Sequence, residues 1–67
     1  MPLRSPRLAQ CVSELPENFS QVLMLVDVAE LSYKDAAETL DIPVGTVMSR
    51  LHRARRMLRE RLEPQAA

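Results

Sequence analysis

Only three residues separate two helical patterns in the middle of this 67-residue chain, and so short a connection leaves few possible arrangements. Apolar residues recur at helical spacing over Tyr33–Leu40 and again from Val44 onward, on either side of Asp41-Ile42-Pro43. Proline near the first turn of a helix is a typical boundary signal. Two helices joined in this way meet at a corner, which the apolar Ile42 would fill. The pattern predicts a helix-turn-helix, although a helical hairpin within a bundle would share much of it.

The rest of the chain carries helical signals as well. We expect four helices, at about 7–14, 16–29, 33–40 and 44–62. Pro16 suits the start of the second helix, Ser32 the cap of the third, and Pro64 the end of the fourth. Two aromatic residues and a single glycine offer little material for hairpins. The sequence therefore predicts an all-α fold, a small four-helix domain over residues 7–63, with an irregular segment 1–6 before it and a tail 64–67 after it.

Charge is divided unevenly along the chain, although the formal net charge is zero. Residues 1–41 contain three basic and seven acidic side chains, which gives 3 − 7 = −4. Residues 42–67 contain six basic and two acidic side chains, which gives 6 − 2 = +4. Such an asymmetry favours a polyanionic partner for the basic half. A solvated helix that carries arginines for solubility is the alternative.

The fourth predicted helix has one apolar face and one polar face. At 100° per residue, an arc of about 80° holds the residues that we expect to be buried, Val47, Leu51, Ala54, Leu58 and Leu62. The opposite side holds Gly45, Ser49, His52, Arg53 and Arg56. Small residues at the start of a helix suit entry into the major groove of DNA, and outward arginines suit contact with phosphates. Val44 and Met48 could meet thymine methyl groups.

Other arginines of this helix are expected to form ion pairs. Arg50 lies beside the apolar face, and we expect it to pair with Asp35 or Glu38 of the third helix. Arg56 has Glu60 four residues further on, and Arg59 has Glu63 at the same spacing. Such pairs on a helix surface are worth only a few tenths of a kcal/mol, which leaves Arg56 free to bind a phosphate.

The second predicted helix is more apolar than DNA binding requires. Its main apolar face consists of Phe19, Val22, Leu23, Val26 and Ala29. Met24, Leu25 and Val28 lie roughly opposite this face. Either the first helix covers them, or they form a partly exposed patch that binds a protein partner. We assign these three residues to partner binding and keep the covered arrangement open.

Several classes of function have no support in the sequence. The chain contains one histidine and one cysteine, and it lacks a glycine-rich phosphate loop. We therefore expect neither an enzyme nor a catalytic residue, a cofactor or a metal site. We find no signal peptide and no apolar run of membrane-spanning length, so we expect a cytoplasmic protein with no membrane partner.

Several segments of the chain resemble region 4 of bacterial sigma factors, and in particular the extracytoplasmic-function group. The resemblance covers about Leu8 to Leu62, and its segments are Leu15-Pro16-Glu17, Gln21–Leu25, Leu31–Leu40 and Pro43–Arg55. The string G-T-V-M-S-R-L-H-R-A-R after L-S-Y-K-D is its most specific part. The resemblance implies a compact helical domain of the winged-helix-like or sigma region 4 type. It also implies that the domain binds the promoter −35 element, docks on the β flap of RNA polymerase core and is sequestered by an anti-sigma factor.

The resemblance assigns DNA contacts residue by residue. The base-reading segment would run from Pro43 to Ser49, arginines would lie near phosphates, and the start of the third helix would meet the DNA backbone. The DNA-binding residues that we predict are Ser32, Tyr33, Lys34, Pro43, Val44, Gly45, Thr46, Met48, Ser49, Arg53 and Arg56.

Three positions depart from the commonest pattern of this family. Asp41 stands where glycine is frequent, so it must adopt a strained or capping conformation. Pro43 stands where serine is frequent, and Met48 stands where lysine is frequent. The string from Pro43 to His52 recurs in a subgroup linked to redox-type stress, which suggests a zinc-containing anti-sigma factor.

Two other functions are compatible with the same predicted fold. One is the output domain of a response regulator of the quorum-sensing type, which shares the short third helix and a T-V-x-S motif. The arginine-rich extension from Arg53 to Arg61 argues against it. The other is a pure protein-interaction module, which the apolar second helix favours.

Overall fold

The computed structural model describes residues 6–62, and every regular element in that range is a helix. The elements are α1 (Pro6–Ser13), α2 (Glu17–Leu23), η1 (Met24–Val28), α3 (Tyr33–Leu40) and α4 (Val44–Leu62). The all-α prediction is confirmed, and the last two helices have the predicted bounds. The first helix begins one residue earlier than expected, at Pro6. The rest of the predicted irregular segment, 1–5, and the predicted tail lie outside the described residues.

The helix expected over residues 16–29 changes character halfway along. It is an α-helix as far as Leu23 and a π-helix in η1, where the Ala29 N–H donates to the Met24 carbonyl five residues earlier at 2.9 Å. Each π-turn holds more residues than an α-turn, so the side chains that follow are rotated relative to regular α-helical geometry. The surroundings of two residues differ from those expected for a regular helix. Ala29 is exposed, and Leu25 is half-buried against the start of the helix-turn-helix.

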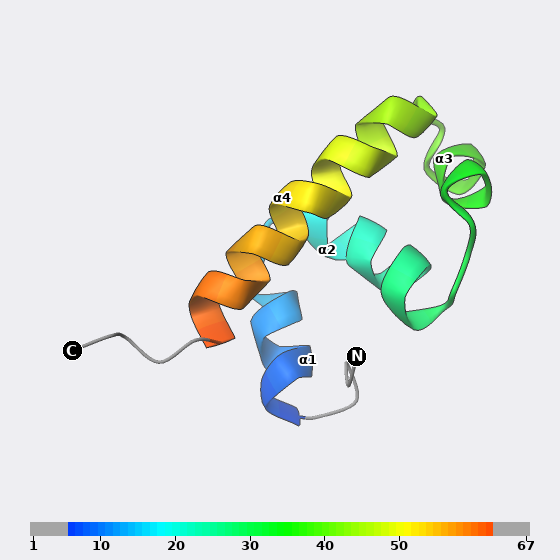
Figure 1. Cartoon of the computed structure of the whole chain (residues 1–67). Coiled ribbons are helices and arrows are strands. Elements are labelled where there is room, and N and C mark those ends of the chain that lie inside the picture. Colours follow the sequence, from blue (N-terminus) through cyan, green and yellow to red (C-terminus); the bar gives the residue numbers. More distant parts are fainter. Residues whose placement is uncertain (1–5, 63–67) are drawn as a thin grey trace.

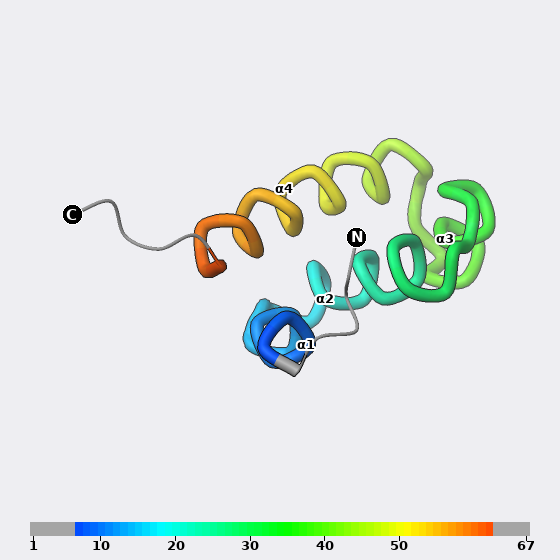
Figure 2. Tube along the Cα trace, turned by 60° about the horizontal axis from the view of Figure 1, so that its bottom comes forward, coloured from blue at the N-terminus to red at the C-terminus, as the bar shows by residue number. Residues whose placement is uncertain are grey.

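The long helix α4 is the element against which the others pack (Figure 1). Figure 2 shows α1 and α2 along one side of α4, with α3 at its N-terminal end. The main core joins α1, α2 and α4, and its buried members are Leu8, Val12, Leu15, Val22, Leu23, Leu51, Ala54 and Leu58. Each Leu or Val side chain removed from water in this way contributes about 1.5–3 kcal/mol, so α4 is held along most of its length.

A second, smaller core lies at the corner between α3 and α4. Its buried members are Ala36, Ala37 and Val47, and Ile42 packs against them from the turn. The two alanines allow the helices to approach closely because they carry only a methyl group. The predicted helix-turn-helix is therefore confirmed, with Ile42 half-buried at the corner.

Hydrogen bonds fix both ends of α3. The Ser32 hydroxyl accepts from the Asp35 N–H at 3.0 Å and caps the first turn. At the other end Asp41 adopts the left-handed conformation, with φ 57° and ψ 49°. The Ile42 N–H donates to the Ala37 carbonyl at 3.0 Å and the Asp41 N–H to the Glu38 carbonyl at 3.3 Å, the pair of bonds that defines a Schellman motif. The expectation that Asp41 takes a capping conformation is confirmed.

Candidate nucleic-acid interface

The two faces of α4 differ as the spacing predicted. Val47 and Ala54 have no exposed surface, Leu51 and Leu58 are 2% exposed, and Leu62 is half-buried. On the opposite side Gly45, Ser49, His52, Arg53 and Arg56 are exposed. The polar side chains of α4 are thus available to a partner, while the apolar stripe holds the helix to the domain.

The first turns of α4 form a low ridge, which we call the crest and define as Gly45, Thr46 and Ser49. A Cβ atom added at Gly45 would meet nothing within 4 Å, so packing inside the domain does not require glycine there. Ser49 is exposed, and its hydroxyl donates to the Thr46 carbonyl at 3.4 Å. Thr46 itself is half-buried. A surface that approaches α4 would meet only small side chains along the crest.

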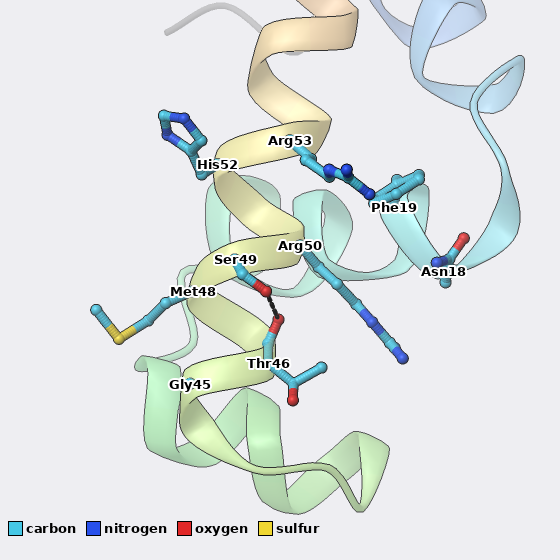
Figure 3. A pocket seen from close by; sticks show the side chains of 9 residues that line it. All are labelled: Asn18, Phe19, Gly45, Thr46, Met48, Ser49, Arg50, His52 and Arg53. Atoms are coloured by element: carbon cyan, nitrogen blue, oxygen red, sulfur yellow. Dashed lines mark hydrogen bonds between the residues drawn. The ribbon is translucent and has the colours of Figure 1, made fainter.

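Figure 3 shows that the side chains on the two flanks of the crest differ in kind. Met48 and His52 project to one side, and Met48 is 51% exposed. Arg50 and Arg53 extend to the other flank, on the side where Asn18 and Phe19 of α2 lie, and Arg50 runs away from Arg53 toward the N-terminal end of α4. Arg53 points toward Phe19 and not straight away from the domain. The angular positions of side chains around a single helix could not predict this direction, because it depends on where α2 lies.

Within residues 6–62, three arginines of α4 form ion pairs. Arg55 donates to the two carboxylate oxygens of Asp27, from Nε at 3.1 Å and from a terminal nitrogen at 2.6 Å. This hydrogen bonding and the opposite charge of Asp27 raise the pKa of Arg55 above its ordinary value, with a smaller contribution from Tyr33. Arg61 pairs with Glu14 at 3.3 Å, which joins α4 to the end of α1. These pairs fix α4 against neighbouring segments.

The third pair was predicted from the sequence. Arg56 lies 3.7 Å from Glu60, but the two side chains are 71% and 67% exposed, so the pair is weak and Arg56 can still reach a partner. The pairing expected between Arg59 and Glu63 falls on a residue outside the described range.

The prediction for Arg50 was wrong. No ion pair joins it to Asp35 or Glu38 in the described part of the chain, and it is half-buried. The arginine beside the apolar stripe that pairs with a carboxylate of the segment just before α3 is Arg55, whose partner is Asp27 of η1. Sequence reasoning missed this pair because the periodicity of α4 does not show which neighbouring element faces Arg55.

The start of α3 provides the remaining predicted DNA-binding residues. Ser32, Tyr33 and Lys34 are all exposed, and Tyr33 is 38% exposed. Ser32 already uses its hydroxyl oxygen as the helix cap, but the hydroxyl hydrogen can still be donated. Of the eleven predicted DNA-binding residues, ten are exposed and Thr46 is half-buried. The exposed residues are Ser32, Tyr33, Lys34, Pro43, Val44, Gly45, Met48, Ser49, Arg53 and Arg56.

A second candidate surface lies between α1 and the segment formed by α2 and η1. It is a groove of about 300 Å³, which we call the apolar groove, and it is lined by Ala9, Val12, Ser13, Ser20, Met24 and Val28. Met24 is 50% exposed and Val28 is 44% exposed, as a partner-binding patch requires. Leu25, assigned to the same patch, is half-buried and packs against the core at the helix-turn-helix corner, and its assignment to partner binding stays a prediction.

Two further properties of the described residues bear on function. Within residues 6–62 no helix is both long and apolar enough to cross a membrane. The same range contains no group of three or more His, Cys, Asp or Glu side chains that could hold a metal ion.

Comparison with known proteins places the chain among transcription proteins. A family model described as "Sigma-70, region 4" matches residues 5–58. The chain is 43% identical over 53 residues to an ECF RNA polymerase sigma-E factor of Haemophilus influenzae, a match that covers 79% of the chain and 28% of the relative.

Two further relatives give similar figures. The ECF RNA polymerase sigma factor SigW of Bacillus subtilis is 41% identical over 58 residues, covering 87% of the chain and 31% of the relative. The RNA polymerase sigma-H factor of Pseudomonas aeruginosa is 42% identical over 55 residues, covering 82% and 28%. The chain thus spans less than a third of the length of these relatives.

Proposed function

Because this chain belongs to the sigma-70 region 4 family, as a DNA-binding domain of the extracytoplasmic-function group, we propose that it recognises the promoter −35 element through the exposed face of α4 and the start of α3. Bound to RNA polymerase within a sigma factor, the domain would direct transcription initiation to promoters that carry this element.

One observation carries the proposal: α4 is anchored along its apolar stripe, while a crest of small side chains with basic residues beside it faces solvent. The major groove of B-DNA is about 12 Å wide, and a helix with its side chains is about 10–12 Å across. A helix start without bulky side chains can therefore approach base edges closely. Arginines a turn or two further on would meet the phosphates that border the groove.

Each predicted residue has a distinct part in this proposal. Thr46 and Ser49 would hydrogen-bond to base edges, and Val44 and Met48 would contact thymine methyl groups. Arg53 and Arg56 would bind phosphates. Pro43 and Gly45 would let the backbone approach, and the residues at the start of α3, Ser32, Tyr33 and Lys34, would contact the DNA backbone.

The salt dependence of DNA binding tests the proposal. About four phosphate contacts would give a slope near −3.6 in a plot of log affinity against log salt concentration, at about −0.9 per contact. Arg53→Ala should weaken binding to all duplexes alike, whereas Ser49→Ala should change the order of preference among them. An affinity that does not change between low and moderate salt would count against the proposal.

The apolar groove favours a second role for the same domain, the binding of a protein partner. We propose that Met24 and Val28 contact the β flap of RNA polymerase core, or a zinc-containing anti-sigma factor that sequesters the domain. Their exposure in a concave apolar surface supports this. Met24→Lys should reduce capture of the flap domain at least tenfold and leave DNA affinity unchanged. Equal capture of the flap by the variant and the wild type would exclude the groove as its binding site.

A further inference from the structure

We propose that the hollow between α2 and α4 is a cradle for a phosphate of the DNA backbone, in which Asn18 and Arg50 join Arg53. This inference rests on the proposed DNA-binding function and extends it to two residues that the family resemblance does not assign. The cradle would hold the DNA strand that runs along the α2 side of the crest.

A hollow lies between the start of α2 and the first three turns of α4. Its volume of about 790 Å³ includes the space over the crest as far as Met48 and His52 on the other flank. Its α2 wall consists of Asn18 and Phe19, and its α4 wall includes Arg50 and Arg53 (Figure 3). The crest forms part of the same lining, so the hollow continues directly into the proposed base-reading surface.

The charge of the cradle is positive and uncompensated. Arg55, Arg56 and Arg61 each pair with a carboxylate, but among the described residues neither Arg50 nor Arg53 has such a partner. No acidic side chain lines the hollow. A phosphate bound in the hollow would accept charge-assisted hydrogen bonds from these guanidinium groups and neutralise their charge.

The position of the arginines favours a phosphate over a base. When the crest enters a groove about 12 Å wide, the flanks of the helix face the walls, which are lined by phosphates. Arg50 and Arg53 lie on one flank, on the side of α2. Phe19 packs against the main core, so the wall toward which Arg53 points is fixed. Asn18, which is exposed beside it, can donate two hydrogen bonds through its amide.

The test uses a duplex selected from a random pool by the wild-type chain. Affinity and salt slope are measured for Arg50→Gln, Arg50→Lys and Asn18→Ala. Arg59→Gln is the matched control, because Arg59 lies nine residues from Arg50 and therefore about 180° around the helix. Circular dichroism checks that each variant is folded. A second set of duplexes carries a single neutral methylphosphonate at each position beside the selected site in turn.

If the cradle binds a phosphate, Arg50→Gln should lower DNA affinity about tenfold and make the slope of log affinity against log salt concentration shallower by about 0.9. Arg50→Lys should keep most of the slope, Asn18→Ala should lower affinity severalfold, and Arg59→Gln should change little. One methylphosphonate position should weaken the wild type and have no further effect on Arg50→Gln. If Arg50→Gln and Asn18→Ala bind like the control while Ser49 and Arg53 variants are impaired, the cradle is wrong and the proposed function stands. If the wild type binds no duplex, both are wrong.

Discussion

At the scale of single residues, two arginines of α4 only five positions apart have different surroundings. Arg55 is fixed by two hydrogen bonds to Asp27, whereas Arg50 has no carboxylate partner among the described residues. Helical periodicity places both beside the apolar stripe but cannot say which neighbouring element faces them. The partner of each arginine depends on how η1 packs, and only the structure contains that information.

A double-mutant cycle measures the value of the pair between η1 and α4. Asp27→Ala and Arg55→Ala should each lower the free energy of unfolding by about 1–2 kcal/mol, with a coupling of about 1 kcal/mol, because the pair is bidentate and Asp27 is mostly buried. Urea denaturation gives these values. The exposed pair of Arg56 and Glu60 is the control, with an expected coupling of about 0.3 kcal/mol. Equal coupling in the two pairs would contradict the structural role of Arg55.

The effect of pH on this pair follows from the raised pKa of Arg55. A group whose pKa is higher in the folded state adds stability below its unfolded pKa and loses it only as the pH rises through the folded value. For arginine that window begins above about 12. Alkaline titration from neutral pH to pH 10 should therefore leave the contribution of Arg55 to the coupling unchanged, as repeated double-mutant cycles can check.

A substitution at Gly45 can distinguish a requirement of DNA binding from a requirement of folding. Gly45→Ala should leave the free energy of unfolding unchanged or raise it by up to about 1 kcal/mol, since the added methyl group meets nothing and alanine favours a helix. The same methyl group stands on the crest, so DNA affinity should fall about tenfold. Thermal unfolding and a DNA titration make the two measurements. Unchanged DNA affinity would mean that the crest does not approach the bases closely.

At the scale of elements, the sequence predicted where helices begin and end better than it predicted the type of helix between those ends. Ser32 and Pro43 predicted the bounds of α3 and the start of α4, because caps and prolines act through the local backbone. The π-turns of η1 left no comparable signal, since an α-helix over the same residues satisfies every local rule. Ala29, placed on the main apolar face, is exposed, and Leu25 is half-buried, while Met24 and Val28 are exposed. Partner binding by Met24, Leu25 and Val28 stays a prediction.

Two element ends carry non-glycine residues in the left-handed region, Glu30 with φ 61° and Asp41 with φ 57°. Glu30→Gly and Asp41→Gly should each raise the free energy of unfolding by about 0.5–1 kcal/mol, since glycine adopts this conformation without a Cβ clash. The gain should be larger for Glu30, because aspartate tolerates the left-handed region better. Urea denaturation tests this, with Glu38→Gly inside α3 as a destabilising control. A loss of stability in both glycine variants would contradict the backbone assignment.

At the scale of the whole molecule, the sequence already indicated which part of the chain carries the basic, DNA-facing surface. Residues 42–67 carry a net charge of +4 and residues 1–41 a net charge of −4, and the basic half includes the helix with the exposed crest. Periodicity predicted which face of α4 is buried, because burial of apolar side chains is the largest driving force in a domain of this kind. The hollow between α2 and α4 could not be predicted, since it arises from the packing of segments about thirty residues apart.

Mapping of backbone amide signals by NMR during a titration with selected duplex DNA tests the central claim most directly. The account predicts that the largest shifts fall on the start of α3 and on Val44 to Arg56, and that amides lining the apolar groove stay nearly unchanged. Shifts concentrated on α1 and η1, or none at saturating DNA in low salt, would contradict it.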